Sequence, residues 1–124
     1  ALAPDAVILA TGSVPLVLPI PGLADCGYVT AQDLLLGKTA AGRRALVVGG
    51  GMVGCEAAEY LAERGHQVAI VEMKDVIAAD VTPENRRYMF RNFEENHVLL
   101  QPGAKAPGNA VLATGDALEA ALAI

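Results

Sequence analysis

The sequence predicts an α/β fold in which a parallel sheet is covered by helices in a three-layer arrangement. Three observations support this prediction. Short apolar runs alternate with helical patterns, a glycine-rich turn joins one such run to a helix, and an acidic residue closes the next run. With 53% hydrophobic and 19% charged residues, the 124-residue chain is typical of a globular domain with a buried core.

The N-terminal part contains one apolar run and one helical pattern. Residues 6–10, AVILA, predict a buried strand that ends at Thr11-Gly12. Residues 15–22 form a connector, because the prolines and glycine there prevent regular structure. Residues 30–36, TAQDLLL, predict a short helix capped by its threonine.

The central segment has the order of a βαβ unit. Residues 45–48 are an apolar run, which predicts a buried strand, and they lead directly into Gly49, Gly51 and Gly54 in GxGxxG spacing. An amphipathic helix follows and ends at a turn around Gly65. This order predicts a Rossmann-like dinucleotide-binding fold.

Each glycine of the turn has a physical reason for its position. Gly49 permits the tight turn out of the strand, Gly51 lets a pyrophosphate approach the backbone, and Gly54 lets the helix pack closely on the strand. Free amides near Met52 and Val53, together with the helix dipole, supply an anion site without a basic side chain. The residues expected to contact the cofactor here are Gly49, Gly50, Gly51, Met52, Val53 and Gly54.

An acid at the end of the second strand completes the predicted site. Residues 67–71 predict that strand, and Glu72 follows it directly. A carboxylate at this position accepts hydrogen bonds from the ribose hydroxyls and repels a 2′-phosphate, which favours NAD(H) over NADP(H). Met73 is expected beside the cofactor, and Lys74 is a cation that softens the preference.

The chain continues with a second helix and a third strand. A loop over residues 75–81 precedes Thr82-Pro83, an N-cap pair, and the helix is expected to reach Asn96. Residues 98–100 are the third strand candidate. Helical spacing predicts two buried faces, one of Val53, Ala57, Ala58 and Leu61 and the other of Met89, Phe90 and Phe93, with Arg91 and Glu95 as a solvent-side pair.

Two short stretches of the chain have nearly the same sequence. Residues 8–12, ILATG, and residues 111–115, VLATG, suggest two related strand ends, each followed by backbone that approaches another group closely. Coincidence in an alanine-rich chain is the alternative.

Composition excludes several classes of function. A formal net charge of −5 argues against nucleic acid as a partner, because phosphate backbones are bound by dense Lys and Arg patches. Residues 6–24 are uncharged, but their prolines and glycines exclude a membrane-spanning helix. Cys26 and Cys55 form no metal-binding cluster and favour a reduced, cytoplasmic setting. Cys55 is either a thiol activated at a helix N-terminus or a small packing residue.

The motifs resemble those of a known family. The glycines at 49, 51 and 54, followed by Glu56 and Glu72, match the NAD-domain pattern of the pyridine nucleotide-disulfide oxidoreductase superfamily, flavoproteins with two dinucleotide domains. Residues 5–22 resemble the ATG motif and linker between the FAD and NAD domains. Residues 47–73 resemble the C-terminal part of 2-enoate reductases, 2,4-dienoyl-CoA reductases and related NADH:flavin oxidoreductases of the old yellow enzyme type.

The resemblance implies an FAD-linked oxidoreductase in which NADH binds this domain and passes hydride to a flavin. It places Glu56 near the nicotinamide, although a helix-dipole partner is an equal alternative. It places Thr11 and Gly12 in the ATG motif beside the FAD domain. Gly115-Asp116 is either the return strand of the NAD domain or a motif that holds FAD. The implied partners are the FAD domain and a catalytic barrel of the same polypeptide.

We expect a partial domain. Residues 1–42 would be an FAD-domain strand end and linker, 43–109 the NAD(H)-binding βαβαβ unit, and 110–124 the return strand or the next FAD-domain segment. The FAD glycine motif, a redox CxxxxC pair, and the iron–sulfur cysteines and barrel of the enoate-reductase branch are absent, so the isolated fragment is expected to be inactive. No catalytic or metal-ligating constellation is visible either. The rival hypotheses are a structural fragment that self-associates into a homo-oligomer through exposed sheet edges, and a stand-alone NAD-dependent dehydrogenase.

Overall fold

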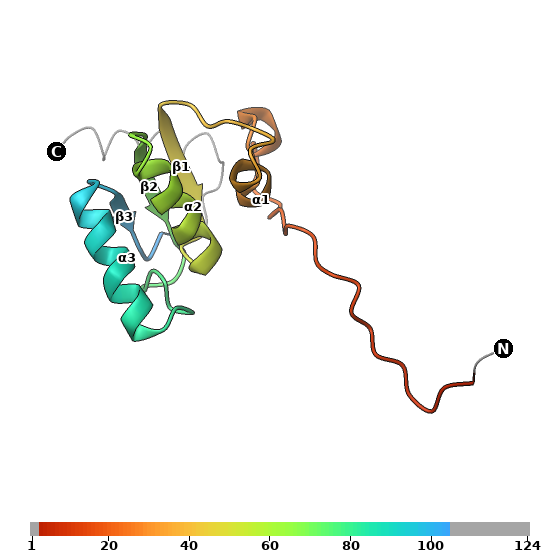
Figure 1. Ribbon diagram of the computed structural model, residues 1–124. Helices are drawn as coiled ribbons and strands as arrows, with labels where there is room; N and C mark the ends of the chain where they lie inside the picture. Colours follow the sequence, from red (N-terminus) through yellow and green to blue (C-terminus); the bar gives the residue numbers. More distant parts are fainter. Residues whose placement is uncertain (1–2, 105–124) are drawn as a thin grey trace.

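The computed structural model describes residues 3–104 (Figure 1). Within this range a compact α/β unit follows an extended N-terminal arm. The elements in chain order are the 3₁₀-helix η1 (Ala24–Cys26), α1 (Ala31–Leu35), β1 (Arg44–Val48), α2 (Met52–Ala62), β2 (Gln67–Val71), α3 (Pro83–Glu95) and β3 (Leu99–Gln101).

The three strands form one parallel sheet in the order β1-β2-β3. Val48 is opposite Val71, and Val71 is opposite Gln101, so the carboxyl ends of all three strands lie at one edge. The chain leaves β1 at Gly49 and β2 at Glu72, which places both at this edge. The predicted Rossmann-like parallel arrangement is confirmed.

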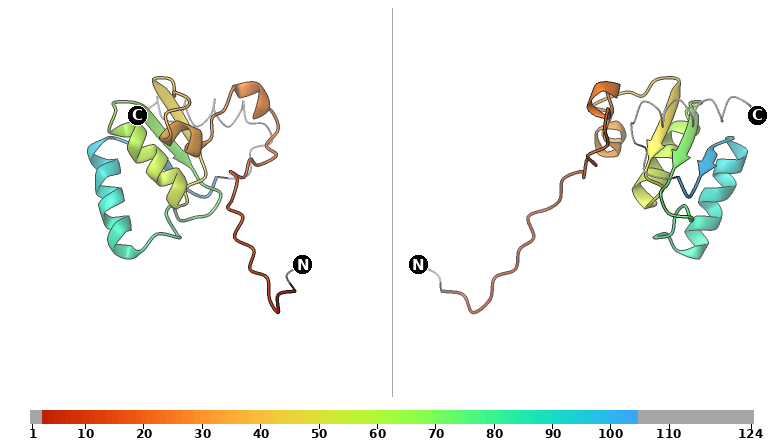
Figure 2. Two further views of the ribbon diagram at one scale, coloured as in Figure 1. Left: turned by 45° about the vertical axis from the view of Figure 1, so that its right-hand side comes forward. Right: turned by 180° about the vertical axis from the view of Figure 1, so that it is seen from behind.

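Helices α2 and α3 cover the same face of the sheet, as expected when each is the right-handed crossover between neighbouring parallel strands (Figure 2). The core lies between these helices and β2. Its most deeply buried side chains are Ile70 of β2, Phe93 of α3 and Cys55 of α2. Each of the three is at most 1% exposed.

The predicted buried face of α2 is partly wrong. Ala57, Ala58 and Leu61 are buried, but Val53 is 55% exposed and Cys55 is fully buried in its place. Cys55 is two residues further along the helix, so Val53 lies on nearly the opposite side of α2 from this buried side chain and faces away from the core.

The prediction for α3 is confirmed. Pro83 occupies the first turn after the N-cap Thr82, whose side chain makes no capping hydrogen bond. Met89 and Phe93 are buried, and Phe90 packs against the core with its ring centroid 5.9 Å from that of Phe93. The helix ends one residue before the predicted Asn96. Arg91 and Glu95 form the expected solvent-side pair, with Nε and Oε1 3.9 Å apart.

The N-terminal arm corrects one prediction and confirms another. Residues 6–10 do not form a strand, and Ile8 is 90% exposed. A strand needs a neighbour for its backbone hydrogen bonds, and no strand among residues 3–104 pairs with this segment. The short capped helix does form: it is α1, and the amide of Asp33 donates to the Thr30 hydroxyl at 3.1 Å.

Two further predictions concern membranes and the C-terminal segment. No helix within residues 3–104 is both long and apolar enough to cross a membrane. Gly115-Asp116, the second ATG-like phrase and the proposed segment 110–124 lie outside the described residues.

Candidate functional site

The glycine turn after β1 has the geometry that its sequence predicts. Gly49 adopts φ +106°, a conformation that disfavours residues with a Cβ, and its amide donates to the carbonyl of Val71 at 2.9 Å. A Cβ on Gly54 would overlap the carbonyl oxygen of Gly49. Gly54 therefore lets α2 pack directly on the end of β1, as predicted.

Gly50 and Gly51 have different surroundings. A Cβ on Gly50 would lie 3.0 Å from the Cβ of Glu72 and 3.2 Å from Ile77, so Gly50 sits in a tightly packed place. For a Cβ on Gly51, the three nearest atoms all belong to the carboxyl group of Asp80, the closest at 3.2 Å. On the side where a Cβ would lie, the atoms closest to Gly51 are therefore those of the Asp80 carboxyl group.

Glu72 points at the glycine turn. Its Oε2 accepts a hydrogen bond from the Gly50 amide at 2.7 Å, and its Oε1 accepts one from the Lys74 amide at 2.8 Å. These two amides, that of Lys74 first, hold the pKa of the Glu72 carboxyl below its ordinary value of 4.5. Glu72 is therefore an oriented anion, and each of its oxygens retains a lone pair for a further donor.

The predicted free amide of Met52 is not free. It donates to both carboxylate oxygens of Asp80, at 3.0 Å to Oδ1 and 3.1 Å to Oδ2. The N-terminus of a helix attracts anions, and here the protein supplies one of its own. By contrast, the amide of Val53 donates to no acceptor among residues 3–104.

Asp80 reaches this position because the loop between β2 and α3 is anchored under the glycine turn. The amide of Ala78 donates to the carbonyl of Gly50 at 2.6 Å, and the Ile77 side chain is 3% exposed. Ala78 adopts φ +56°, which is uncommon for a residue with a Cβ. No periodic pattern marks this arrangement, so the sequence analysis missed Asp80.

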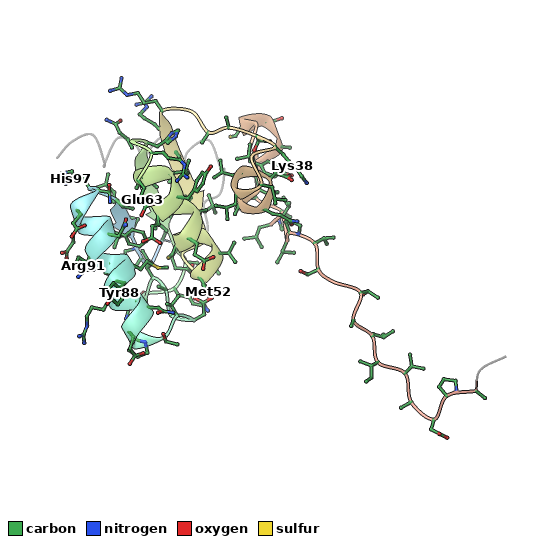
Figure 3. The ribbon with its side chains drawn as sticks, in the orientation of Figure 1. Lys38, Met52, Glu63, Tyr88, Arg91 and His97 are labelled. Atoms are coloured by element: carbon green, nitrogen blue, oxygen red, sulfur yellow. The ribbon has the colours of Figure 1, made fainter. Side chains whose placement is uncertain are left out.

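A groove of about 260 Å³ opens beside the start of α2. Its lining residues are Met52, Glu56, Glu59, Val81, Asn85, Tyr88 and Met89. In Figure 3, Met52 at the start of α2 and Tyr88 in the middle of α3 lie at about the same height in the view. Burial, and then the nearby Glu63 and Glu56 carboxylates, raise the pKa of Glu59.

A larger hollow of about 420 Å³ lies along α3 and shares no residue with the glycine turn, so we assign it no part in this site.

The remaining predicted site residues lie apart from the glycine turn or at its edge. Glu56 is exposed on α2 and lines the groove, which leaves both of its predicted roles open. Met73 is 70% exposed next to Glu72. Thr11 and Gly12 are exposed on the N-terminal arm, which extends away from the sheet (Figure 1).

Cys55 packs below the turn as a core residue. Burial, and then the charge of Asp80, raise its pKa to about 11, so the thiol is not activated by its place near the helix N-terminus. Cys26, by contrast, is exposed. No group of His, Cys, Asp or Glu side chains within residues 3–104 is arranged to hold a metal ion.

Comparisons with known proteins agree with this fold. The family model for pyridine nucleotide-disulphide oxidoreductases matches residues 1–122. The chain is 43% identical over 107 residues to the NADH oxidase of Thermoanaerobacter brockii, a match that covers 83% of the chain. It is 47% identical over 73 residues, 59% of the chain, to the cinnamate reductase of Clostridium sporogenes.

A solved structure has the same fold over most of the chain. The 2-naphthoyl-CoA reductase complex superposes with a TM-score of 0.72 and 28% sequence identity, over 76% of this chain and 14% of that protein. The chain spans 16% of the length of the NADH oxidase and 11% of the cinnamate reductase. It therefore corresponds to a small part of each of these proteins.

Proposed function

This chain belongs to the pyridine nucleotide-disulphide oxidoreductase family, and from that premise we propose that its glycine turn and Glu72 bind NADH, which reduces a flavin carried by the same polypeptide. The unit that would bind the dinucleotide is the βαβαβ segment of residues 43–109. When bound, NADH supplies a hydride. The residues of this chain supply its placement.

The position of the Glu72 carboxylate carries the proposal. It lies at the carboxyl end of β2, is fixed by two backbone amides, and faces the turn between β1 and α2. In this fold the ribose and pyrophosphate occupy that crevice. The remaining lone pairs of Glu72 suit ribose hydroxyls, and its charge repels a 2′-phosphate, so NADH is favoured over NADPH.

The glycine turn of this chain suits NADH, whereas the residues expected beside FAD lie on the N-terminal arm. The atoms nearest to a Cβ on Gly51 belong to the Asp80 carboxyl, an exposed side chain that can move away from a phosphate, and the Val53 amide is available as a donor. Thr11 and Gly12 lie exposed on the arm, with nothing within 4 Å of a Cβ placed on Gly12. We therefore propose FAD as a cofactor of the whole protein. Thr11 and Gly12 are proposed to contact the FAD domain of that protein.

We extend the proposal to a 2-enoate as the final electron acceptor. Its support is the likeness of residues 47–73 to 2-enoate reductases and the relative named cinnamate reductase. The relative named NADH oxidase points instead to oxygen as the acceptor. NADH consumption by the intact protein, measured without oxygen and with cinnamate added, distinguishes the two. Turnover only when oxygen is present would contradict the enoate.

The binding proposal has its own test. The intact protein is titrated with NADH and with NADPH separately, and its absorbance spectrum is recorded. We expect a flavin spectrum and saturable NADH binding that is tighter than NADPH binding. No saturable NADH binding, or a clear preference for NADPH, would refute the cofactor assignment.

One observation favours a second candidate function, a structural module that self-associates. Val7 and Leu9 of the N-terminal arm are 73% and 84% exposed, and Ile8 between them is also exposed. Exposed apolar segments promote association with another surface. Sedimentation with and without NADH separates the two candidates. An oligomer that forms independently of NADH, in a protein with no affinity for NADH, supports the structural module.

A further inference from the structure

Asp80 occupies the place where the pyrophosphate of a bound dinucleotide would meet the helix. Both of its carboxylate oxygens lie within 3.1 Å of the Met52 amide nitrogen. The first turn of α2 contains no acid of its own, and its N-cap, Gly51, has no side chain to cap the helix. Asp80 therefore supplies the anion that this helix end attracts.

The loop that carries Asp80 is fixed, but the carboxylate is exposed. The loop is held by the hydrogen bond from the Ala78 amide to the Gly50 carbonyl and by the buried Ile77 side chain. The Asp80 carboxylate accepts no other hydrogen bond from residues 3–104. Rotation of this one side chain therefore frees the Met52 amide without unfolding the loop.

From these contacts we infer that Asp80 competes with the dinucleotide: it caps α2 in the free protein and leaves the Met52 amide when the pyrophosphate of NADH binds. The inference rests on the proposed function. A pyrophosphate and a carboxylate are both anions, so they repel each other when placed at one amide. Each molecule of NADH must therefore displace Asp80, and this lowers its apparent affinity.

Replacement of Asp80 tests the inference. In the Asp80→Asn variant an amide oxygen can still accept from Met52, but the negative charge is gone. In Asp80→Ala both are lost. Both variants of the intact protein are expected to bind NADH about threefold to tenfold more tightly than the wild type, the range of a charge near a helix end. If Asp80→Ala does not fold, Asp80→Asn still tests the inference, because its amide oxygen can cap α2 and preserve the fold.

Two comparisons isolate the pyrophosphate. ADP-ribose carries the pyrophosphate and is expected to show the same gain as NADH, whereas adenosine, which has no phosphate, is expected to bind all forms equally. Asp75→Asn is the matched control, because Asp75 is an exposed acid of the same loop whose side chain makes no hydrogen bond to residues 3–104. It is expected to leave NADH affinity within twofold of wild type.

The outcomes separate this inference from the proposed function. Tighter NADH and ADP-ribose binding in both Asp80 variants, with adenosine unchanged, supports the inference. Saturable NADH binding that is unchanged or weaker in Asp80→Asn overturns it while the proposed function stands. An equal gain for adenosine also overturns it. Absence of saturable NADH binding in the wild type and all variants overturns the proposed function, and the inference with it.

Discussion

The Oε2 atom of Glu72 accepts a hydrogen bond from the Gly50 amide at 2.7 Å. This bond joins the carboxyl end of β2 to the glycine turn that follows β1. The register of the sheet makes it possible, because Val48 is paired with Val71, two residues before Gly50 and one residue before Glu72. The acid is thereby aimed into the crevice where parallel α/β sheets bind their ligands.

Replacement of this acid should weaken the binding of NADH selectively. Glu72→Gln keeps the size of the side chain but removes its charge, so the charge-assisted hydrogen bonds to the ribose are lost. We expect NADH affinity to fall about tenfold, as suits a loss of about 1.4 kcal/mol. NADPH affinity should not fall, because the 2′-phosphate is no longer repelled. Titration with each nucleotide checks this, and an equal loss for both would contradict the role of Glu72.

The matched control for this variant is Glu84→Gln. Glu84 is an exposed acid in the first turn of α3, away from the glycine turn. Its replacement changes the net charge by the same amount and should leave the ratio of NADH to NADPH affinity unchanged.

The lowered pKa of Glu72 predicts how stability depends on pH. The folded state favours the carboxylate, because the amides of Lys74 and Gly50 donate to it. Its contribution to the free energy of unfolding is therefore complete above pH 4.5 and is lost as the pH falls through the lower folded pKa. Denaturant titrations of wild type and Glu72→Gln between pH 6 and pH 3 should show a difference that shrinks on acidification. A difference that grows below pH 4.5 would be inconsistent with this geometry.

Gly54 is predicted to matter for folding. A Cβ at this position would overlap the backbone carbonyl of Gly49, which cannot move without shifting β1 or α2. We expect Gly54→Ala to destabilise the fold by about 3 kcal/mol. Gly42→Ala is the control, because the nearest atom to its Cβ is a carbonyl oxygen at 3.9 Å. Denaturant titration measures both variants, and equal stability would disprove the close approach of helix and strand.

Gly51 is predicted to matter for binding instead. Its φ of −77° suits any residue, and the nearest atoms to an added Cβ belong to the exposed Asp80 carboxyl, which can move. Gly51→Ala should therefore cost less than about 1 kcal/mol of stability. The methyl group would fill the approach of the pyrophosphate, so NADH affinity should fall at least about tenfold. Wild-type affinity in this variant would place the pyrophosphate elsewhere.

The two cysteines should differ sharply in reactivity. Cys26 is exposed, whereas Cys55 is buried and its pKa is raised to about 11. A thiol reagent at pH 8 should modify Cys26 rapidly and Cys55 only after unfolding. Cys26→Ser should abolish the fast reaction. Rapid modification of this variant in its folded state would show that Cys55 is accessible.

The sequence predicted the βαβ unit because its signals are local. The bounds of β2 and the turn formed by Gly49, Gly51 and Gly54 depend on the conformation and packing of a short stretch of chain. The position of Glu72 was equally predictable, since a residue directly after a parallel strand must lie at the carboxyl edge. These features need no information from distant segments.

The predictions that were wrong or missing depend on contacts with other parts of the fold. Residues 6–10 have the composition of a strand, but a strand forms only beside another strand, and none among residues 3–104 pairs with them. Val53 fits the helical period, but the buried face of α2 includes Cys55, which lies on nearly the opposite side of the helix from Val53. The position of Asp80 depends on the left-handed backbone of Ala78 and on the buried Ile77, and neither leaves a periodic signal. The roles of Thr11 and Gly12 remain predictions.

Hydrogen exchange of the backbone amides tests the central claim most directly, because it locates NADH on the chain. The intact protein is exchanged with and without saturating NADH, and peptides that cover residues 49–54 are compared with peptides from α3. We predict slower exchange at residues 49–54 when NADH is bound and no change in α3. Bound NADH that leaves exchange at residues 49–54 unaltered would contradict it.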